Sequence, residues 1–395
     1  MVFKSLALDV TYSLTPLYIY FRIFKPLIKD DPYRHEPPQS RANARFGGIS
    51  RPSPIRRLNA IFPRPTQPVL GARARLVLAS DIAGPAEPVE RVDRLLAAVL
   101  LELGPVDATG EVGADDPVVV VAVVHVEHEE PRAGVELVGV VDVNQPRAEE
   151  IAASAHTQAY TDAAALMGRV DAVTIAVPTE QHHAVAMPFL HAGVAVLVEK
   201  PMARSLAEAD DMVDAAAKAG VVLAAGHTER FNPAVEAARP LLANPRFIEV
   251  HRLGTFPERS LDIDVVFDLM IHDLDLLLAV VGSEVVAVEA VGVNVLTPRT
   301  DIANARIRFA SGCVANVTAS RISRDRIRKA RFFQRDAYIS IDFAEQELEM
   351  YRLVRDGGRP SIQGGKLEVT REEPLRRELE DFLGAVREQR APTVT

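Results

Sequence analysis

The sequence lacks three features that would each point directly to a class of protein. It has one cysteine, Cys313, which excludes an internal disulfide and favours a reducing compartment, the cytoplasm. It has no basic block against a net charge of -9, which argues against a nucleic-acid partner. Charged residues such as Lys4, Asp9 and Arg22 interrupt its apolar stretch from Val2 to Leu27, and no small-residue cleavage site follows. A membrane anchor and a signal peptide are therefore not expected, whereas an interfacial helix is compatible with this stretch.

What is present fits a globular protein, but the composition is uneven along the chain. With 395 residues, 48% apolar and 25% charged, the chain is long enough for two domains. Fifteen of the 27 prolines lie before Ala133, so residues 1–116 are predicted to be largely loop or disordered, apart from a helix at Pro88–Leu103. A strand is predicted at Pro117–Val126.

From Gly134 onward, short apolar strands alternate with helical periodicity. The predicted strands are Val135–Val141, Val170–Val177, Val194–Val198 and Val221–Ala225, and the predicted helices are Gln145–Ser154, Tyr160–Met167, Gln181–His191 and Ser205–Ala219. Thr179 and Ser205 are predicted to cap the last two of these helices. The alternation predicts an α/β fold with a doubly wound sheet, which binds ligands at the carboxyl ends of its strands.

Two charged groups stand at that edge of the predicted sheet. Asp142 ends the first of these strands, where a carboxylate accepts hydrogen bonds from both hydroxyls of an adenosine ribose and repels a 2'-phosphate; a loop cap is the alternative. Lys200 follows Glu199 and precedes Pro201, which stiffens the turn. The lysine is placed to reach a ligand across the sheet, and a solvated Glu-Lys pair is the alternative.

A second group of polar residues lies on a predicted helix, Val265–Val281. Asp268 and His272 are four residues apart, so an α-helix brings them to one face. A carboxylate beside an imidazole raises its basicity, as a general base near neutral pH requires. A structural pair is the alternative, and a metal site ranks lower because a third ligand at fixed spacing is missing.

These motifs together resemble the Gfo/Idh/MocA family of oxidoreductases. The matching segments are V-P-T-E-Q-H at 177–182, E-K-P at 199–201 and D-L-M-I-H at 268–272. The resemblance implies a Rossmann-like, NAD-binding domain over residues 117–225. It also implies a substrate and oligomerisation domain over residues 226–395, with an open, mostly antiparallel sheet through which the chain forms a homo-oligomer.

The resemblance also implies roles for individual residues. Lys200 binds the reacting hydroxyl near the nicotinamide, His272 takes the hydroxyl proton while hydride leaves the same carbon, and Asp268 orients His272. No metal is implied. The residues expected to contact NAD are Asp142, Pro178, Thr179, His182, Glu199 and Lys200.

A narrower likeness lies in the segments G-H-T-E-R-F-N-P at 226–233 and R-F-F-Q at 331–334. They look like the branch that oxidises the C3 hydroxyl of UDP-N-acetylglucosamine on the way to lipid A. Guanidinium groups fit phosphate oxygens, although arginines on a sheet are also commonly just solvated. The residues predicted to bind the substrate are Arg230, Asn232, Arg252 and Arg259, with Arg321 as a further candidate for the diphosphate.

The start of the chain departs from the family pattern. No G-x-G occurs anywhere, although the family places a glycine-rich turn after its first strand to cradle the pyrophosphate. Eight residues separate Val126 from Val135, too few for a parallel crossover, so the first strand is predicted to form a hairpin or to lie on an edge. We hypothesise that the sequence before about Ala133 is not a native domain. Two functions are therefore predicted: an NAD-dependent sugar or nucleotide-sugar dehydrogenase or, alternatively, a cofactor-deficient relative that binds sugars or oligomerises.

Overall fold

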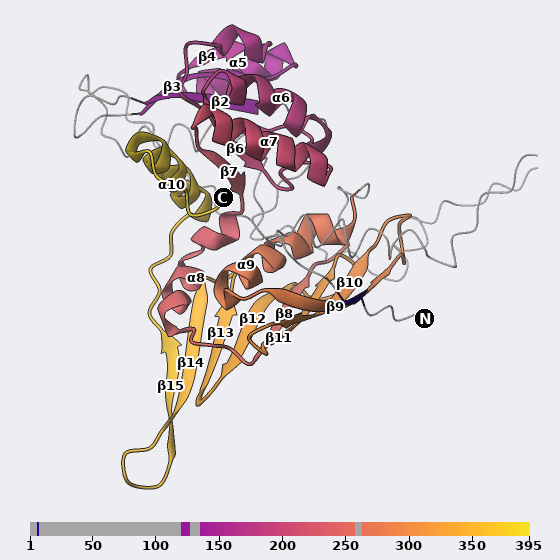
Figure 1. The fold of residues 1–395 in the computed structure, drawn as a ribbon, viewed down its shortest axis with the longest axis vertical. Coiled ribbons are helices and arrows are strands. Elements are labelled where there is room, and N and C mark those ends of the chain that lie inside the picture. Colours follow the sequence, from indigo (N-terminus) through magenta and orange to yellow (C-terminus); the bar gives the residue numbers. More distant parts are fainter. Residues whose placement is uncertain (1–5, 8–119, 127–134, 257–262) are drawn as a thin grey trace, which may run out of the picture. The chain divides into compact units, whose positions relative to one another are not determined.

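Two β-sheets with helices packed against them organise the chain (Figure 1). The computed structural model describes residues 6–7, 120–126, 135–256 and 263–395, so the predicted helix at Pro88–Leu103 and the predicted substrate residue Arg259 lie outside the described residues. The first sheet has six strands in the order β4-β3-β2-β5-β6-β7. The second has nine, in the order β1-β9-β10-β11-β8-β12-β13-β14-β15.

The first sheet contains the strands that the sequence predicts, at nearly the predicted positions. They are β3 (Val135–Val141), β5 (Ala172–Ala176), β6 (Ala195–Glu199) and β7 (Leu223–Gly226), with the short β4 (Gln158–Tyr160) at the edge. The pairs β3/β4, β5/β6 and β6/β7 are all parallel. The predicted doubly wound α/β arrangement is thus confirmed for this part of the chain.

Three helices connect these strands. They are α5 (Gln145–Ser154), α6 (Thr179–His191) and α7 (Leu206–Ala219). The predicted cap of α7 is confirmed, because the Ser205 hydroxyl accepts the Glu208 N–H at 3.2 Å. For α6 the predicted cap is wrong: the helix begins at Thr179 itself, and Pro178 occupies the cap position without a side-chain bond.

The predicted helix at Tyr160–Met167 is also wrong. Tyr160 instead ends β4, which pairs with β3, and only Ala163–Leu166 forms a short 3₁₀ turn, η2. The Asp162 carboxylate accepts the Ala164 N–H at 2.9 Å and so starts this turn. Sheet pairing therefore outweighs helical periodicity over this short segment.

The strand β2 (Val120–Val126) lies inside the first sheet, antiparallel to both β3 and β5. The predicted hairpin with the following strand, β3, is confirmed. The alternative, a position at the edge of the sheet, is wrong, because β2 lies between β3 and β5. Val126 pairs with Val135 because the connection between β2 and β3 is too short for a crossover. The end of β2 therefore lies at the edge opposite Asp142, and its start, Val120, lies beside Ala176 at the ligand edge.

Apolar side chains cover both faces of the first sheet. On one face, residues such as Phe189 of α6 and Met212 of α7 pack with Val196. On the other, Leu379 and Phe382 of the C-terminal helix α10 (Pro374–Glu388) join a second apolar cluster. The sequence assigns α10 to the second predicted domain, yet it packs against the first sheet.

The second sheet is open and almost entirely antiparallel, as predicted. Its strands are β1 (Leu6–Ala7), β8 (Phe247–Leu253), β9 (Val285–Val293), β10 (Ile302–Phe309), β11 (Val314–Ser320), β12 (Ile327–Gln334), β13 (Ala337–Asp342), β14 (Glu347–Val354) and β15 (Ser361–Leu367). Among the described strands of this sheet, only β8 and β11 pair in parallel. A buried apolar cluster on one face joins the sheet to α8 (Pro233–Ala238) and to the helix that carries the D-x-x-x-H motif.

That helix is not one continuous α-helix. Val266–Met270 form a π-helical turn, η5, and the α-helix α9 follows at Ile271–Val281. Gly282, in the left-handed conformation at a φ of 56°, ends it. None of the helices in the described part of the chain is long and apolar enough to cross a membrane.

Candidate active site

Lys200 and Asp268 meet, as the sequence predicts for residues of one site. Lys200 follows β6, and its Nζ donates a hydrogen bond to the Asp268 backbone oxygen at 2.9 Å. The same Nζ lies 3.8 Å from Asp268 Oδ1. Both side chains are about one-fifth exposed, at 20% and 18%, so this cation remains accessible to a bound molecule.

The expected contact between Asp268 and His272 is different in the structure. Within the described residues, no hydrogen bond joins the two side chains, and the Asp268 carboxylate faces Lys200 instead. The π-helical turn explains the difference, because its wider turn removes the alignment that residues four apart have in an α-helix. Asp268 is thus in a position to act on the ammonium group, and orientation of His272 by Asp268 stays a prediction.

His272 is a buried, neutral imidazole. Its pKa lies well below the usual value, first because of burial and then because of the positive charges of Lys200, Arg252 and Arg328 and of the neighbouring His227. Its Nδ1 is buried and meets no hydrogen-bond partner among the described residues. A neutral imidazole beside an ammonium group is suited to accept a proton from a hydroxyl that the ammonium binds.

His182 supports the loop that carries Lys200. Its Nε2 lies 2.7 Å from the Val177 oxygen at the end of β5, and its Nδ1 lies 3.0 Å from the Pro201 oxygen beyond β6. Burial lowers the pKa of this ring, so the neutral ring donates to one of the two carbonyls at a time. His182 thus joins the ends of two strands, and a direct contact to a cofactor stays a prediction.

Glu199 packs closely against the next strand. Its Oε2 accepts the Lys200 backbone N–H at 3.1 Å. A Cβ atom at Gly226 would lie 2.8 Å from this same Oε2, so glycine leaves the room that the carboxylate occupies. Burial raises the pKa of Glu199, with the Lys200 charge acting against this.

Asp142 is almost fully buried at the end of β3. Its Oδ1 accepts the Asn144 N–H at 2.7 Å, and Arg147 Nε lies 3.6 Å from Oδ2. Oδ2 has no hydrogen-bond donor in the part of the chain that the structure describes. Burial raises the pKa of this carboxyl group. The structure therefore shows the loop-cap role and, in addition, one buried carboxylate oxygen without a hydrogen-bond donor among the described residues.

Two of the predicted substrate arginines are buried in ion pairs. Arg252 binds the Asp273 carboxylate with Nε and with Nη2, the latter at 2.9 Å, and its Nη1 lies 3.3 Å from Glu229. Arg321 donates from Nε to Asp301 at 3.0 Å. Both arginines are 2% exposed, so carboxylates of the protein already take the place predicted for a diphosphate.

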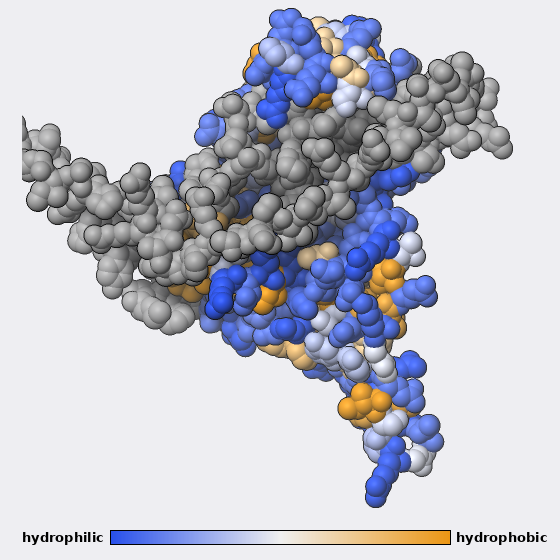
Figure 2. All heavy atoms as spheres, turned by 180° about the vertical axis from the view of Figure 1, so that it is seen from behind, coloured by the Kyte–Doolittle hydropathy of each residue, from blue (hydrophilic) through white to orange (hydrophobic). Residues whose placement is uncertain are grey.

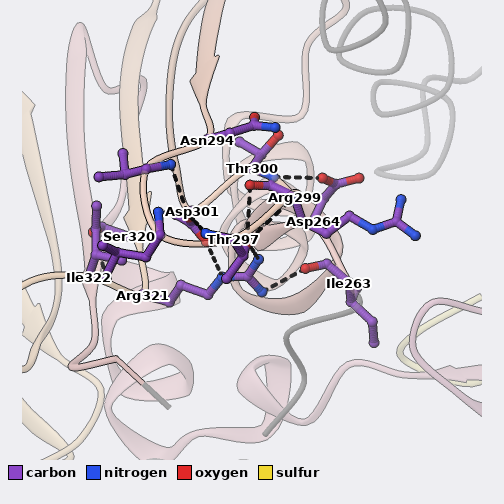
Figure 3. Close-up of polar contacts among 12 residues, drawn as sticks. Ile263, Asp264, Asn294, Thr297, Arg299, Thr300, Asp301, Ser320, Arg321 and Ile322 are labelled. Carbon is purple, nitrogen blue, oxygen red and sulfur yellow. Dashed lines mark hydrogen bonds and ion pairs between the residues drawn. The ribbon is translucent and has the colours of Figure 1, made fainter. Parts of the chain in front are cut away.

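Arg321 also anchors the start of the segment that carries Asp268 and His272 (Figure 3). Its Nη1 donates to the Ile263 backbone oxygen at 2.6 Å, and the Thr300 N–H donates to Asp264 Oδ1 at 2.9 Å. Asp301 holds the turn before β10 through three backbone N–H groups, which lower the pKa of its carboxyl group despite burial. This network fixes where the π-helical turn begins.

The two remaining predicted substrate residues in the described part of the chain, Arg230 and Asn232, also bond within the protein. Arg230 is partly exposed and binds Asp275 of α9 through Nε at 2.6 Å and Nη2 at 3.2 Å. Asn232 is buried, accepts the Ala234 N–H as the cap of α8, and donates to the Phe343 oxygen at 3.0 Å. Arg230 is thus the predicted arginine that remains closest to solvent among those described.

Sequence reasoning missed two buried groups beside the site, His227 and Glu378. His227 follows β7 directly, at the carboxyl end of a strand just as Lys200 is, and this position was a usable signal. Glu378 lies on the apolar stripe of α10, between Leu375 and Phe382, where a charged residue is out of place. The described residues contain no group of three His, Cys, Asp or Glu side chains arranged to hold a metal ion.

Comparison with known proteins identifies the family. Residues 120–227 match the model of the oxidoreductase family with an NAD-binding Rossmann fold, and residues 244–338 match the GFO/IDH/MocA C-terminal domain. The chain belongs to the Gfo/Idh/MocA family. The resemblance predicted from the three motifs is thereby confirmed, as are the NAD-dependent oxidoreductase class and NAD as the cofactor of the fold.

Individual relatives agree with this assignment. The chain is 42% identical to UDP-N-acetylglucosamine 3-dehydrogenase of Acidithiobacillus ferrooxidans over 64% of this chain and 81% of that protein. The solved structure of the same enzyme aligns with a TM-score of 0.62 and 41% identity, covering 66% of this chain and 84% of that one. A probable dehydrogenase of Thermotoga maritima aligns with a TM-score of 0.56 at 23% identity, covering 66% of this chain and 84% of that one, which shows the fold alone. The predicted likeness to the UDP-N-acetylglucosamine branch is therefore confirmed.

The residues present fit NAD at two of its parts. The open Oδ2 of buried Asp142 suits a ribose hydroxyl, and Lys200 and neutral His272 suit a hydroxyl substrate beside a nicotinamide. The fit to the pyrophosphate of NAD is poorer. Because β2 runs antiparallel to β3, it ends at the sheet edge opposite Asp142 and not at the ligand edge.

Proposed function

We propose that the protein is an NAD-dependent dehydrogenase that oxidises the C3 hydroxyl of UDP-N-acetylglucosamine. The observation that carries the proposal is the meeting of Lys200, which follows β6 of the first sheet, with the helical segment that bears Asp268 and His272 and packs on the second sheet. The 42% identity to an enzyme of that name supports the choice of substrate. The product belongs to the route that leads to a 3-amino sugar of lipid A.

The side chains divide the chemistry between them. The Lys200 ammonium binds the substrate hydroxyl and stabilises the alkoxide that develops on it. Neutral His272 accepts the hydroxyl proton, and the Asp268 carboxylate holds the ammonium in place. NAD supplies the hydride acceptor when it is bound, through Asp142 at a ribose and through the residues that follow β5 and β6.

The diphosphate of such a substrate requires a cation that is not already buried. Arg230 fits this role, because its pairing with Asp275 leaves the guanidinium partly exposed. Arg252 and Arg321 support the site from the buried side through Asp273 and Asp301. Arg259 stays a predicted phosphate residue.

A homo-oligomer through the second sheet is part of the proposal. Four aromatic side chains form a continuous row across β8, β12, β13 and β14, with ring centroids 5.3 to 6.3 Å apart: Phe247, Phe333, Tyr338 and Tyr351. Ile362 on the adjacent β15 is 76% exposed. Figure 2 shows isolated apolar patches on an otherwise mostly hydrophilic face. An apolar row that continues across an open sheet supports a second copy of the chain as its partner.

The cytoplasm is the location that we propose. Cys313 is free and buried, which suits a reducing compartment. The cytoplasm also supplies NAD and nucleotide sugars to a dehydrogenase.

The first experiment is calorimetry of NAD binding to the full chain, followed by an assay of NADH formation with UDP-N-acetylglucosamine. We expect binding at about micromolar concentration and turnover that is lost in Lys200→Ala. The matched control is Lys218→Ala, an exposed lysine paired with Asp214 on α7. Binding without turnover of any sugar nucleotide would refute the substrate assignment.

A cofactor-deficient sugar-binding or oligomerising protein is the second candidate. The antiparallel course of β2 favours it, since the strand that precedes the glycine-rich turn in this family is parallel to its neighbours. Under this alternative the same calorimetry shows no NAD binding, while UDP-N-acetylglucosamine still binds. The two candidates therefore give opposite results in one titration.

A further inference from the structure

Buried polar atoms without protein partners gather beside the catalytic histidine. Among the described residues, Nδ1 of His272, Nδ1 of His227 and both carboxylate oxygens of Glu378 are buried without a hydrogen-bond partner. Such atoms are costly to bury, so a folded protein keeps few of them. Four of the nine such atoms in the described residues belong to these three side chains, which indicates a use beyond stability.

His227 connects this group to His272. The two rings stand edge to face, with centroids 6.3 Å apart. Asp275 of α9, Arg230 of η3 (Thr228–Phe231) and Lys200 after β6 are the charged groups that act on His227, and burial lowers its pKa. A neutral imidazole beside the catalytic base can receive a proton from it, directly or through one water molecule.

Glu378, on α10, is close enough to His227 for the two residues to interact. It is 2% exposed, and its surroundings are acidic: Glu199 of β6, Asp275 of α9 and Asp381 of α10 itself. Burial, first, and then these three carboxylates raise its pKa well above the usual value. Glu378 therefore holds its proton to a higher pH than an ordinary carboxyl group, and in its protonated form it can accept one proton and release another.

A cavity of about 620 Å³ leads away from this group. Its lining includes His227 and Asp275 at one end and Asp171 and Gly193, before β5 and β6, at the other. It therefore extends from the ligand edge of the first sheet to the opposite edge. Arg390, which pairs with Asp381 at 3.0 Å, also lines it and connects Glu378 to the same space.

We propose that His227 and Glu378 form an exit route for the proton that His272 takes from the substrate. The inference rests on the proposed function and adds a path by which the base is restored while the substrate still covers it. His227 and Glu378 act through His272, and neither is required to touch the substrate. Asp381 and the cavity lined by Arg390 deliver the proton to solvent.

Each step conserves protons. The substrate hydroxyl proton goes to one ring nitrogen of His272, and the proton on the other ring nitrogen goes to His227. His227 passes a proton to Glu378 in the same way, and Glu378 accepts it on its carbonyl oxygen while its own acidic proton leaves towards Asp381. Every group ends with the number of protons with which it began, and one proton reaches solvent for each hydride transferred.

Kinetics of the full chain with NAD and UDP-N-acetylglucosamine provide the first test. Glu378→Gln keeps the shape of the side chain and removes its acidic proton, so we expect kcat to fall at least about tenfold, KM to stay within about twofold and the solvent deuterium isotope effect to rise. His227→Ala should lose kcat similarly and regain at least about threefold with added imidazole, which the cavity admits. The matched controls are Glu236→Gln, whose carboxylate pairs with Arg377 on the surface, and His183→Ala, paired with Asp211.

The second test needs no turnover. Exchange of the His272 ring N–H with water is measured by NMR on the full chain without substrate, with the signal assigned by its loss in His272→Asn. We expect this exchange to slow at least about tenfold in Glu378→Gln and in His227→Ala, and to keep the wild-type rate in both controls.

Unchanged exchange in Glu378→Gln and His227→Ala overturns the exit route, whether or not the chain is an active dehydrogenase. A fall in kcat that imidazole does not reverse, with a matching rise in KM, overturns it as well. Failure of the proposed function is distinguishable, because it abolishes NADH formation in the wild type and leaves the exchange experiment intact.

Discussion

Two groups of buried ionisable residues in this protein differ in how completely they are satisfied. Around the second sheet, Arg252 with Asp273 and Arg321 with Asp301 are ion pairs in which both partners are at most 2% exposed. Beside the candidate active site, His272, His227 and Glu378 are also buried but keep polar atoms without partners among the described residues. The residues of the first group form their hydrogen bonds with each other. The residues of the second group keep donor or acceptor atoms that can bond to a ligand or exchange a proton.

This difference separates buried residues that stabilise the structure from buried residues that take part in binding or catalysis. A satisfied pair contributes rigidity, because its bonds hold only if the elements stay in place. An unsatisfied group costs free energy of folding and is kept where a ligand or a proton completes it. The two groups should therefore respond oppositely to substitution, one through stability and the other through catalysis.

The largest expected effect is on catalysis. His272→Asn keeps a polar, uncharged side chain, though a smaller one, and removes the base, so kcat should fall about 10³-fold, which corresponds to about 4 kcal/mol of barrier. The free energy of unfolding should change by less than about 1 kcal/mol, since the ring makes no protein hydrogen bond through Nδ1. Initial rates and urea unfolding of the same preparation measure both quantities. A large loss of stability would show that His272 stabilises the fold, as the ion pairs of Arg252 and Arg321 do.

Much of this arrangement was predictable from the sequence, because it depends on local patterns. The strand Val135–Val141 and the helix Gln145–Ser154 have the predicted bounds, since apolar runs and helical spacing act over a few residues. Lys200 was predictable as a residue of the site for a similar reason, because the carboxyl ends of parallel strands share one edge.

Features that depend on distant partners were not predictable. Asp273 lies 21 residues from Arg252, and nothing in the sequence pairs them in advance. Asp268 and His272 have α-helical spacing, yet the structure inserts a π-helical turn at Val266–Met270. The interior place of β2 likewise depends on its pairing with β5, which is distant in sequence.

The next largest effect is on stability. Arg252→Met leaves Asp273 buried without its partner and should lower the free energy of unfolding by about 3 to 5 kcal/mol. The matched control is Arg331→Met on β12, whose pair with Glu249 is about one-third exposed and should contribute less than about 1 kcal/mol. Urea unfolding of both variants measures the contrast. Equal losses at the two positions would contradict the assignment of Arg252 to a satisfied buried pair.

A smaller effect links the buried histidines to pH. The folded pKa of His182 lies below its unfolded value because of burial, so the unfolded chain binds more protons as pH falls below about 6.5 and stability is lost on acidification. His182→Gln removes this contribution. Between about pH 6.5 and about pH 5.5, the wild type should lose more stability than the variant, by at most about 1 kcal/mol.

Urea unfolding at the two pH values measures this difference. The matched substitution His183→Gln, at the next position of α6, should leave the wild-type pH dependence in place. The opposite sign for His182→Gln, with the variant losing more stability in acid, would contradict a neutral buried ring.

The smallest effect applies the same contrast to two helix ends. The N-terminus of α7 is completed by the Ser205 hydroxyl, whereas α6 begins at the ligand edge with no side-chain cap. Ser205→Ala should therefore lower the free energy of unfolding by about 1 kcal/mol, and Thr179→Ala by only a few tenths, about 0.3 kcal/mol. If NAD binds at this edge, saturating NAD should raise the stability of both variants and of the wild type alike, apart from any contact that Thr179 itself makes with the cofactor. Equal losses at the two positions without NAD would show that the start of α6 is satisfied by the protein and is not held open for a ligand.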